Sequence, residues 1–164
     1  MPVDPASLLA ASSAAFAPVL MPMQAVLFLL LLVAVSVCDL KWREIPDRLQ
    51  FTIAALTLLC FSPLNLWGTL GALPYLVIAL FFGGGDGMGG GDIKLTAATG
   101  MVLGLPASLT ASILGLGLMS VVCGLITCRR RLRGQKEKVA YPAGPFLAVG
   151  AAAAYFMKIG GLIL

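Results

Sequence analysis

The 164-residue chain contains no histidine and few charged residues. Without histidine, catalysis by Ser-His-Asp or Cys-His groups and metal sites built on imidazole are excluded. Only 11% of the residues are charged and 60% are hydrophobic, whereas an ordinary soluble domain has roughly 25% charged residues. Eleven basic and seven acidic side chains cannot cover the surface of a soluble domain of this size. These scarcities exclude a soluble globular domain, a disordered tail and a nucleic-acid-binding module, and they predict a polytopic membrane protein.

Cysteine is also scarce, and its spacing favours no metal site. The four cysteines show no C-x-x-C spacing and lie in or beside apolar runs, at Cys38, Cys60, Cys123 and Cys128. A free cysteine in such a run behaves as a small hydrophobic side chain. The sequence therefore predicts neither a zinc site nor a disulfide framework, and no cofactor is expected.

Charged loops, together with two uncharged turns, divide the chain into six apolar segments. They cover about residues 18–38, 48–62, 66–82, 92–105, 107–128 and 144–163. The second and fourth are short for a hydrocarbon core of about 30 Å, so they are expected to tilt, meet thinner lipid or be partly re-entrant. Uncharged turns are predicted at residues 62–65 and 104–106. The expected fold is an all-α bundle of about six membrane helices. A single domain covers residues 18–164, preceded by a short exposed lead-in at residues 1–17 that lacks the basic start of a signal peptide.

Lysine and arginine give the expected orientation, because they concentrate in cytoplasmic loops. Six of them lie at residues 129–138, between the fifth and sixth segments. Alternation of the segments then places the loops at residues 39–48 and 83–91 on the same side. Ten of the eleven basic residues share that face, and the exception, Lys158, can snorkel to the opposite interface. Both chain ends are therefore expected outside.

Five of the seven acidic residues fall in two of these cytoplasmic loops, and acids so close to hydrocarbon favour a functional hypothesis. Asp39 directly follows the first apolar segment, where the dipole of a helix end disfavours a carboxylate. The plain alternative is an interfacial charge paired with Lys41 or Arg43. Asp92 follows a run of glycines at the start of the fourth segment, where it could simply cap a helix.

Two aspartates on one membrane face could work as a catalytic pair. Like charges about 3 Å apart cannot both ionise, so one carboxyl stays protonated while the other can activate water. The protonated partner polarises the scissile carbonyl and later donates a proton to the leaving amine. The neighbouring glycines lack Cβ atoms, so an extended peptide can approach their backbone closely. This chemistry needs neither histidine nor a metal.

Three stretches resemble the type IV prepilin peptidases, a family of GxGD membrane aspartic peptidases. In chain order they are DLKWREIPD at 39–47, GGGDIKL at 89–95 and YPAGP at 141–145. The resemblance implies that Asp39 and Asp92 are the catalytic pair and that Gly89 and Gly91 are the motif glycines. It further implies substrate-binding or supporting roles for Pro46, Asp47 and Lys94. Where the family usually has asparagine, this chain has Asp47, which adds a third acid near the site.

The resemblance also implies a substrate and a place in the cell. Members of the family remove the short basic leader from prepilins at the cytoplasmic face of the bacterial inner membrane. A second GGGD sequence ends at Asp86, but Asp92 is preferred because an apolar helix follows it at once. The paired cysteines of the long, methylating members are absent, so the chain is similar to the peptidase-only forms of tight-adherence (Flp) pilus systems.

The sequence alone leaves three other functions open. One is a related GxGD intramembrane protease of the presenilin or signal-peptide-peptidase kind, although Cys38 stands where those have tyrosine. Another is a small transporter or channel subunit, which would carry its acids near the bilayer midplane. A third is a non-catalytic pilus-assembly subunit. The expected partners are a prepilin and the lipid bilayer, with no nucleic acid, and the oligomeric state is open.

Overall fold

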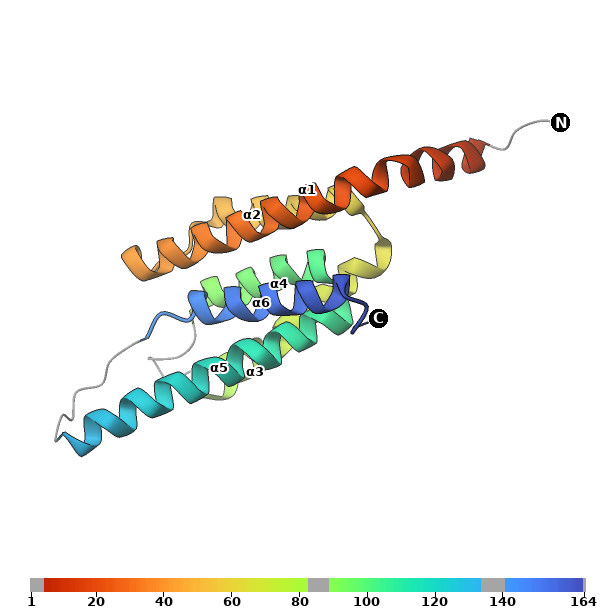
Figure 1. Ribbon diagram of the computed structural model, residues 1–164. Helices are drawn as coiled ribbons and strands as arrows, with labels where there is room; N and C mark the ends of the chain where they lie inside the picture. Colours follow the sequence, from red (N-terminus) through yellow and green to blue (C-terminus); the bar gives the residue numbers. More distant parts are fainter. Residues whose placement is uncertain (1–4, 83–88, 134–140, 164) are drawn as a thin grey trace.

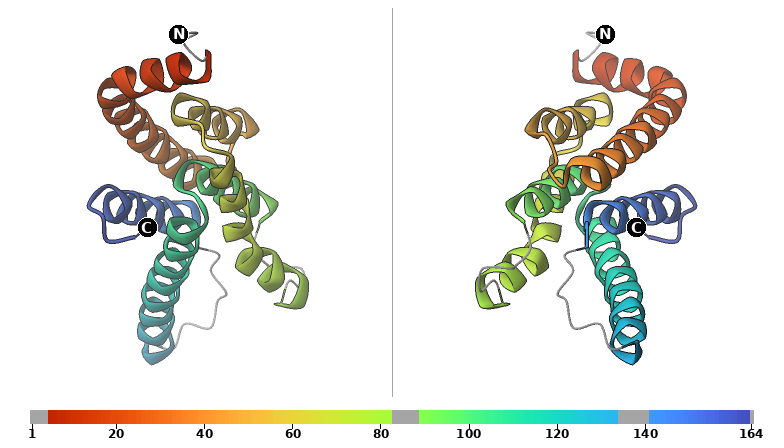
Figure 2. Two further views of the ribbon diagram at one scale, coloured as in Figure 1. Left: turned by 90° about the vertical axis from the view of Figure 1, so that its right-hand side faces the viewer. Right: turned by 90° about the vertical axis from the view of Figure 1, so that its left-hand side faces the viewer.

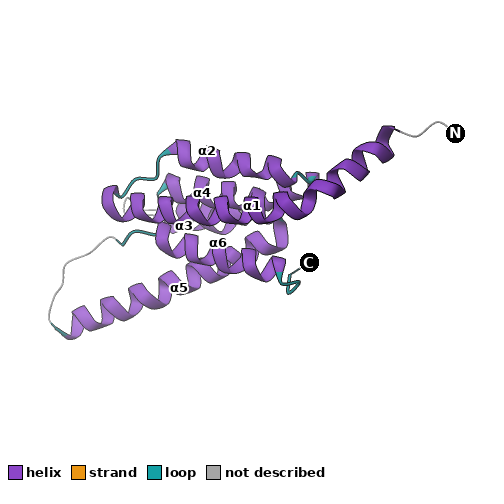
Figure 3. Ribbon diagram, turned by 45° about the horizontal axis from the view of Figure 1, so that its top comes forward, coloured by secondary structure: helices purple, strands orange, loops and turns teal. Residues whose placement is uncertain are grey.

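The computed structural model describes residues 5–82, 89–133 and 141–163, and all regular structure among them is helical. The elements are α1 (Pro5–Trp42), α2 (Asp47–Ala55), α3 (Leu73–Phe82), α4 (Gly90–Leu103), α5 (Leu105–Leu132) and α6 (Gly144–Ile159), with 3-10 helices η1 (Leu56–Cys60) and η2 (Pro63–Ala72). The predicted all-α membrane bundle is confirmed (Figure 3). Helix α1 begins at Pro5, so residues 5–17 of the expected lead-in are helical and form the first part of α1.

Three stretches are long and apolar enough to cross a membrane, namely Pro18–Trp42, Pro63–Phe81 and Leu105–Leu132. Helix α6 is apolar but shorter. The second and fourth predicted segments are short, as expected. At 1.5 Å per α-helical residue and 2.0 Å per 3-10 residue, α2 with η1 extends about 24 Å and α4 about 21 Å.

Both predicted turns are shorter than expected. Pro63 already begins η2, because the fixed φ of proline and its missing N–H suit the first turn of a helix. Only Gly104 separates α4 from α5, and Leu105 and Pro106 belong to α5. Gly104 has φ +78°, a conformation that residues with a Cβ atom rarely adopt, so a single glycine suffices to reverse the chain.

Helix α4 lies at the centre of the bundle and contacts α2, α5, α6 and η2 (Figure 1). Small residues permit this packing. A methyl group added at Gly68 would collide with the backbone of Gly100, so α4 and η2 touch backbone to backbone. Two serine hydroxyl groups of α5 donate hydrogen bonds to backbone carbonyl groups of η2. Ser108 donates to Gly68 O and Ser112 donates to Gly71 O, each at 2.7 Å.

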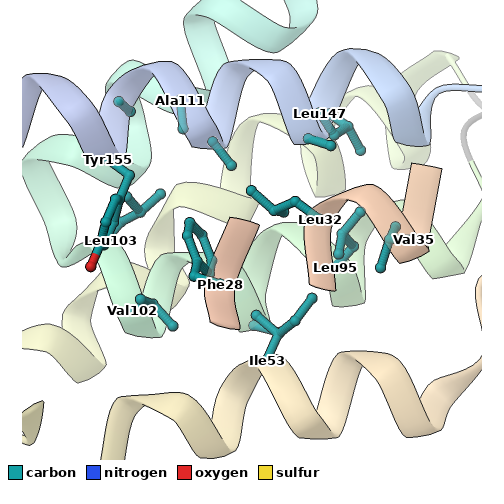
Figure 4. Close-up of a cluster of buried hydrophobic side chains, with 14 of the residues drawn as sticks. Phe28, Leu32, Val35, Ile53, Leu95, Val102, Leu103, Ala111, Leu147 and Tyr155 are labelled. Carbon is teal, nitrogen blue, oxygen red and sulfur yellow. The ribbon is translucent and has the colours of Figure 1, made fainter. Parts of the chain in front are cut away.

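The apolar core joins all these helices (Figure 4). Phe28 of α1 packs on Tyr155 of α6 with ring centroids 5.1 Å apart. Ile53 of α2 and Leu95 of α4 belong to the same cluster, and both are almost completely buried (Figure 4). Away from the core, α3 and the second half of α5 diverge from the bundle (Figure 2).

The helix directions bring three ends together. The C-terminal end of α1 and the N-terminal ends of α4 and α6 lie at one end of the molecule, whereas Pro5 and Ile159 lie toward the other (Figure 1). The residues predicted to carry chemistry are therefore gathered at a single end of the bundle.

Candidate active site

Asp39 lies in the last turn of α1 and is only 7% exposed. Its Oδ2 accepts a hydrogen bond of 2.7 Å from the backbone N–H of Gly144, the first residue of α6. The N-terminus of α6, which is the positive end of its helix dipole, therefore contacts this carboxylate. This contact supplies what the end of α1 lacks, because a carboxylate at a helix C-terminus is otherwise disfavoured. Neither Lys41 nor Arg43 forms an ion pair with Asp39 among the described residues.

The chain turns sharply after Asp39 and returns over the same end of the bundle. Arg43 ends α1 in the left-handed conformation, with φ +54°, and its N–H donates to Asp39 O at 2.9 Å. Pro46 then precedes Asp47, the first residue of α2. The turn places the segment between α1 and α2 beside the start of α4.

Asp92 is the third residue of α4, and the residue that caps the helix is Gly89. Asp92 is therefore not the N-cap residue itself. The Asp92 N–H donates to Gly89 O at 3.0 Å, and the Asp92 carboxylate accepts a hydrogen bond from the Gly89 backbone. A methyl group on Gly89 would lie 3.7 Å from Asp92 Oδ2. The glycine turn thus holds the carboxylate in the first turn of a helix, where a negative charge is tolerated.

Both aspartates line one pocket of about 760 Å³. All seven residues predicted for the site line it: Asp39, Pro46, Asp47, Gly89, Gly91, Asp92 and Lys94. The other lining residues are Trp42, Arg43, Glu44 and Ile45. A pocket of this size falls in the range of small-molecule and peptide side-chain sites. Asp86, the alternative to Asp92, lies outside the described residues.

The two carboxylates have different electrostatic surroundings. Asp92 precedes the apolar part of α4 and lies outside the three stretches that could span a membrane. Burial and, second, the negative charge of Asp39 raise the pKa of Asp92 to about 6, against a smaller lowering by the Gly89 hydrogen bond. With a pKa of about 6, Asp92 holds its proton at mildly acidic pH. Asp39 accepts its hydrogen bond from the N–H of Gly144, at the start of a different helix.

Lys94 and Asp47 form an ion pair across the mouth of the pocket, with Nζ 3.0 Å from Oδ1. Their side chains are 61% and 59% exposed, so the pair contributes at most about 1 kcal/mol to stability. Lys94 thus has Asp47 as its hydrogen-bonded partner, although it follows Asp92 by only two residues. Asp47, the third acid of the site, therefore has a basic partner.

Besides the four additional lining residues, two residues that hydrogen-bond to the site were not among the predicted site residues. Gly144 was recognised only as part of the YPAGP stretch, and its distance of 105 residues from Asp39 hid their contact. Gln50 is buried, and its Nε2 lies 3.3 Å from Gly91 O. The available signal in the sequence was a glutamine inside the apolar segment that follows the IPD sequence. Within the described parts of the chain, no three histidine, cysteine or acidic side chains are grouped so that they could hold a metal ion.

Comparison with known proteins identifies related sequences. The sequence model of the type IV leader peptidase family matches residues 26–128, which include Asp39 and Asp92. A prepilin leader peptidase/N-methyltransferase of Bacillus subtilis (strain 168) is 37% identical over 164 residues, covering 92% of this chain and 62% of the relative. The protein of the same name from Burkholderia pseudomallei (strain K96243) is 35% identical over 141 residues, covering 76% of this chain and 43% of the relative.

The chain thus spans about half the length of the curated relatives it matches. No solved structure matches it significantly. The family match covers more than half of the chain, and the Bacillus subtilis relative matches nearly all of it. The chain therefore belongs to the type IV leader peptidase family.

Proposed function

We propose that the protein is a membrane aspartic endopeptidase that removes the leader peptide from type IV prepilins. The observation that carries the proposal is the pair of aspartates in one pocket, Asp39 hydrogen-bonded to the Gly144 N–H and Asp92 with its pKa raised to about 6. Both carboxylates lie at helix ends rather than near the middle of a span, which favours a peptidase over an ion-coupled transporter.

In the proposed reaction, Asp39 takes a proton from water as the water oxygen bonds to the scissile carbonyl carbon. Asp92 gives its proton to the carbonyl oxygen, which produces a neutral tetrahedral diol. As the diol collapses, one of its hydroxyl protons returns to Asp92. Asp39, which now holds the proton taken from water, passes it to the leaving nitrogen in place of Asp92, and the C–N bond breaks. The pair ends with the same single proton with which it began.

The substrate and location follow from the family and from charge. The matched relatives are named prepilin leader peptidases, so a prepilin leader is the proposed substrate, with a tight-adherence (Flp) pilin as the preferred type. Acidic residues outnumber basic residues around the pocket, four to two, which suits a basic leader. The proposed location is the bacterial inner membrane, with the pocket on the cytoplasmic side and both termini periplasmic.

The proposal is tested by incubating the purified protein in lipid nanodiscs with a synthetic prepilin peptide that includes the leader. Mass spectrometry should find one cut at the leader boundary, and added chelators should leave the rate unchanged because no step uses a metal. A folded protein that leaves the peptide intact, or a rate abolished by chelators and restored by a metal ion, would refute the proposal.

The pH dependence of cleavage should reflect the proton on Asp92. Because the pKa of Asp92 is raised to about 6, the proton needed for catalysis is present below that pH and is lost above it. The value of kcat/KM is therefore expected to fall as pH rises through about 6, approaching tenfold per pH unit, with an apparent pKa that belongs to the pair. Initial rates between pH 4 and 9 measure this limb. A rate that still rises between pH 7 and 9 would contradict the assignment of Asp92 as the acid.

The orientation is testable by cysteine labelling in whole cells. In a background without the four native cysteines, Arg133→Cys should react only with reagents that cross the inner membrane. Asn65→Cys, at the other end of the bundle, should react with impermeant reagents. The opposite pattern would reverse the proposed topology.

A further inference from the structure

Gln50 joins two walls of the pocket through one buried amide. It lies on α2 and is only 5% exposed. Its Nε2 is 3.3 Å from Gly91 O, in the first turn of α4, and 3.4 Å from Ile45 O, in the turn that precedes α2. The amide has two N–H groups, so one can serve each carbonyl.

Both carbonyl groups belong to backbone that carries candidate catalytic machinery. Gly91 immediately precedes Asp92, and Ile45 lies in the short segment between Asp39 and α2. A methyl group added at Gly91 would lie 3.8 Å from Ile45 Cβ and 3.9 Å from Gln50 Nε2. The glycine turn, the segment before α2 and Gln50 are therefore packed in contact.

The other polar link between α2 and α4 cannot fix their spacing as well. The Lys94–Asp47 pair is exposed, and two long, solvated side chains hold a position loosely. Gln50 is buried, so if its amide moved away from the two carbonyl groups no water would replace the lost hydrogen bonds. Its next turn on α2 presents Ile53, also buried, so the same face of α2 is anchored by an apolar contact and a polar one.

We infer that Gln50 is a positioning residue that holds the Gly91–Asp92 turn against α2 so that Asp92 faces Asp39. The inference rests on the proposed peptidase function. Gln50 touches neither carboxylate and takes no proton. Its loss should displace the acid of the pair and so slow the chemical step, with little effect on how the peptide binds elsewhere in the pocket.

Gln24 provides a matched control. It is a buried glutamine, 6% exposed, on α1, and its Nε2 donates to Leu56 O at 2.9 Å. It does not line the pocket. Gln50→Met and Gln24→Met each remove one buried amide from a helix and keep a side chain of similar volume. A purely structural role would therefore lower the thermal midpoint in both variants and change kcat in neither after correction for folded protein.

The experiment measures kcat, KM and the pH profile of prepilin cleavage for the parent and three variants in nanodiscs. We expect Gln50→Met to lose at least tenfold in kcat, to change KM less than threefold, and to shift the alkaline limb of the pH profile. Gln24→Met should keep kcat within twofold of the parent. Gln50→His retains an N–H donor and should keep kcat within about fivefold.

Equal kcat for Gln50→Met and the parent would overturn the inference while leaving the peptidase function intact. So would an equal loss in Gln24→Met, or a loss in Gln50→His as large as in Gln50→Met. If the folded parent does not cleave the prepilin, the proposed function fails, and the inference falls with it.

Discussion

Asp39→Asn and Asp92→Asn are each expected to slow prepilin cleavage about 10³-fold, because each removes one member of a general acid–base pair. Asparagine matches the shape of aspartate, so the Gly144 N–H can still donate to the side-chain oxygen at position 39 and the fold is retained. Single-turnover cleavage of a synthetic prepilin, followed by mass spectrometry, measures the loss.

Asp86→Asn is the control for this prediction, since Asp86 ends the other GGGD sequence. It should keep most of the parent rate. The assignment of Asp92 is wrong if Asp86→Asn abolishes cleavage and Asp92→Asn does not. Comparable losses in both variants would point to a third acid in the mechanism.

Gly144→Ala is expected to reduce cleavage at least 100-fold with only modest loss of thermal stability. The added methyl group would lie 2.8 Å from Oδ2 and 2.9 Å from Cβ of Asp39, closer than carbon atoms tolerate. The carboxylate must move, and it then loses the N–H donor and the helix N-terminus that favour its charge. Misplacing a catalytic group by about 1 Å can cost on the order of 100-fold in rate.

Gly90→Ala is the matched control for Gly144→Ala. Gly90 is likewise the first residue of a helix, in this case α4, and a methyl group added there meets no atom within 4 Å. It should leave the rate within about threefold of the parent. A full rate in Gly144→Ala would show that Asp39 does not depend on its contact with α6.

Much of the fold could be predicted because the few charged residues lie mostly between the apolar segments and so mark where the helices end. The positions of Asp39 and Asp92 followed from local patterns, an acid after one apolar run and an acid after glycines before another. The sequence predicts only that the two aspartates share a membrane face, whereas in the structure they line one pocket. Helix termini were harder to predict, because Pro63 and Pro106 are typical of turns in a sequence. In the structure each lies in the first turn of a helix.

The supporting contacts could not be predicted, since they join backbone groups far apart in the chain. Nothing in the sequence near Asp39 indicates that the N–H of Gly144 reaches it. The same holds for Gln50, whose partner Gly91 is 41 residues away. Such contacts depend on how the helices pack, and one-dimensional patterns report only which face of each helix is apolar.

Asp39 and Asp92 are proposed to act as one unit that holds one proton. The most direct test of this proposal compares the single-turnover cleavage rates of Asp39→Asn, Asp92→Asn and the double variant with that of the parent. Residues that act as a unit have strongly non-additive effects, so the double variant should be no slower than the slower single variant, within about threefold. Single effects that multiply in the double variant, or a single variant that cleaves at the parent rate, would contradict the account.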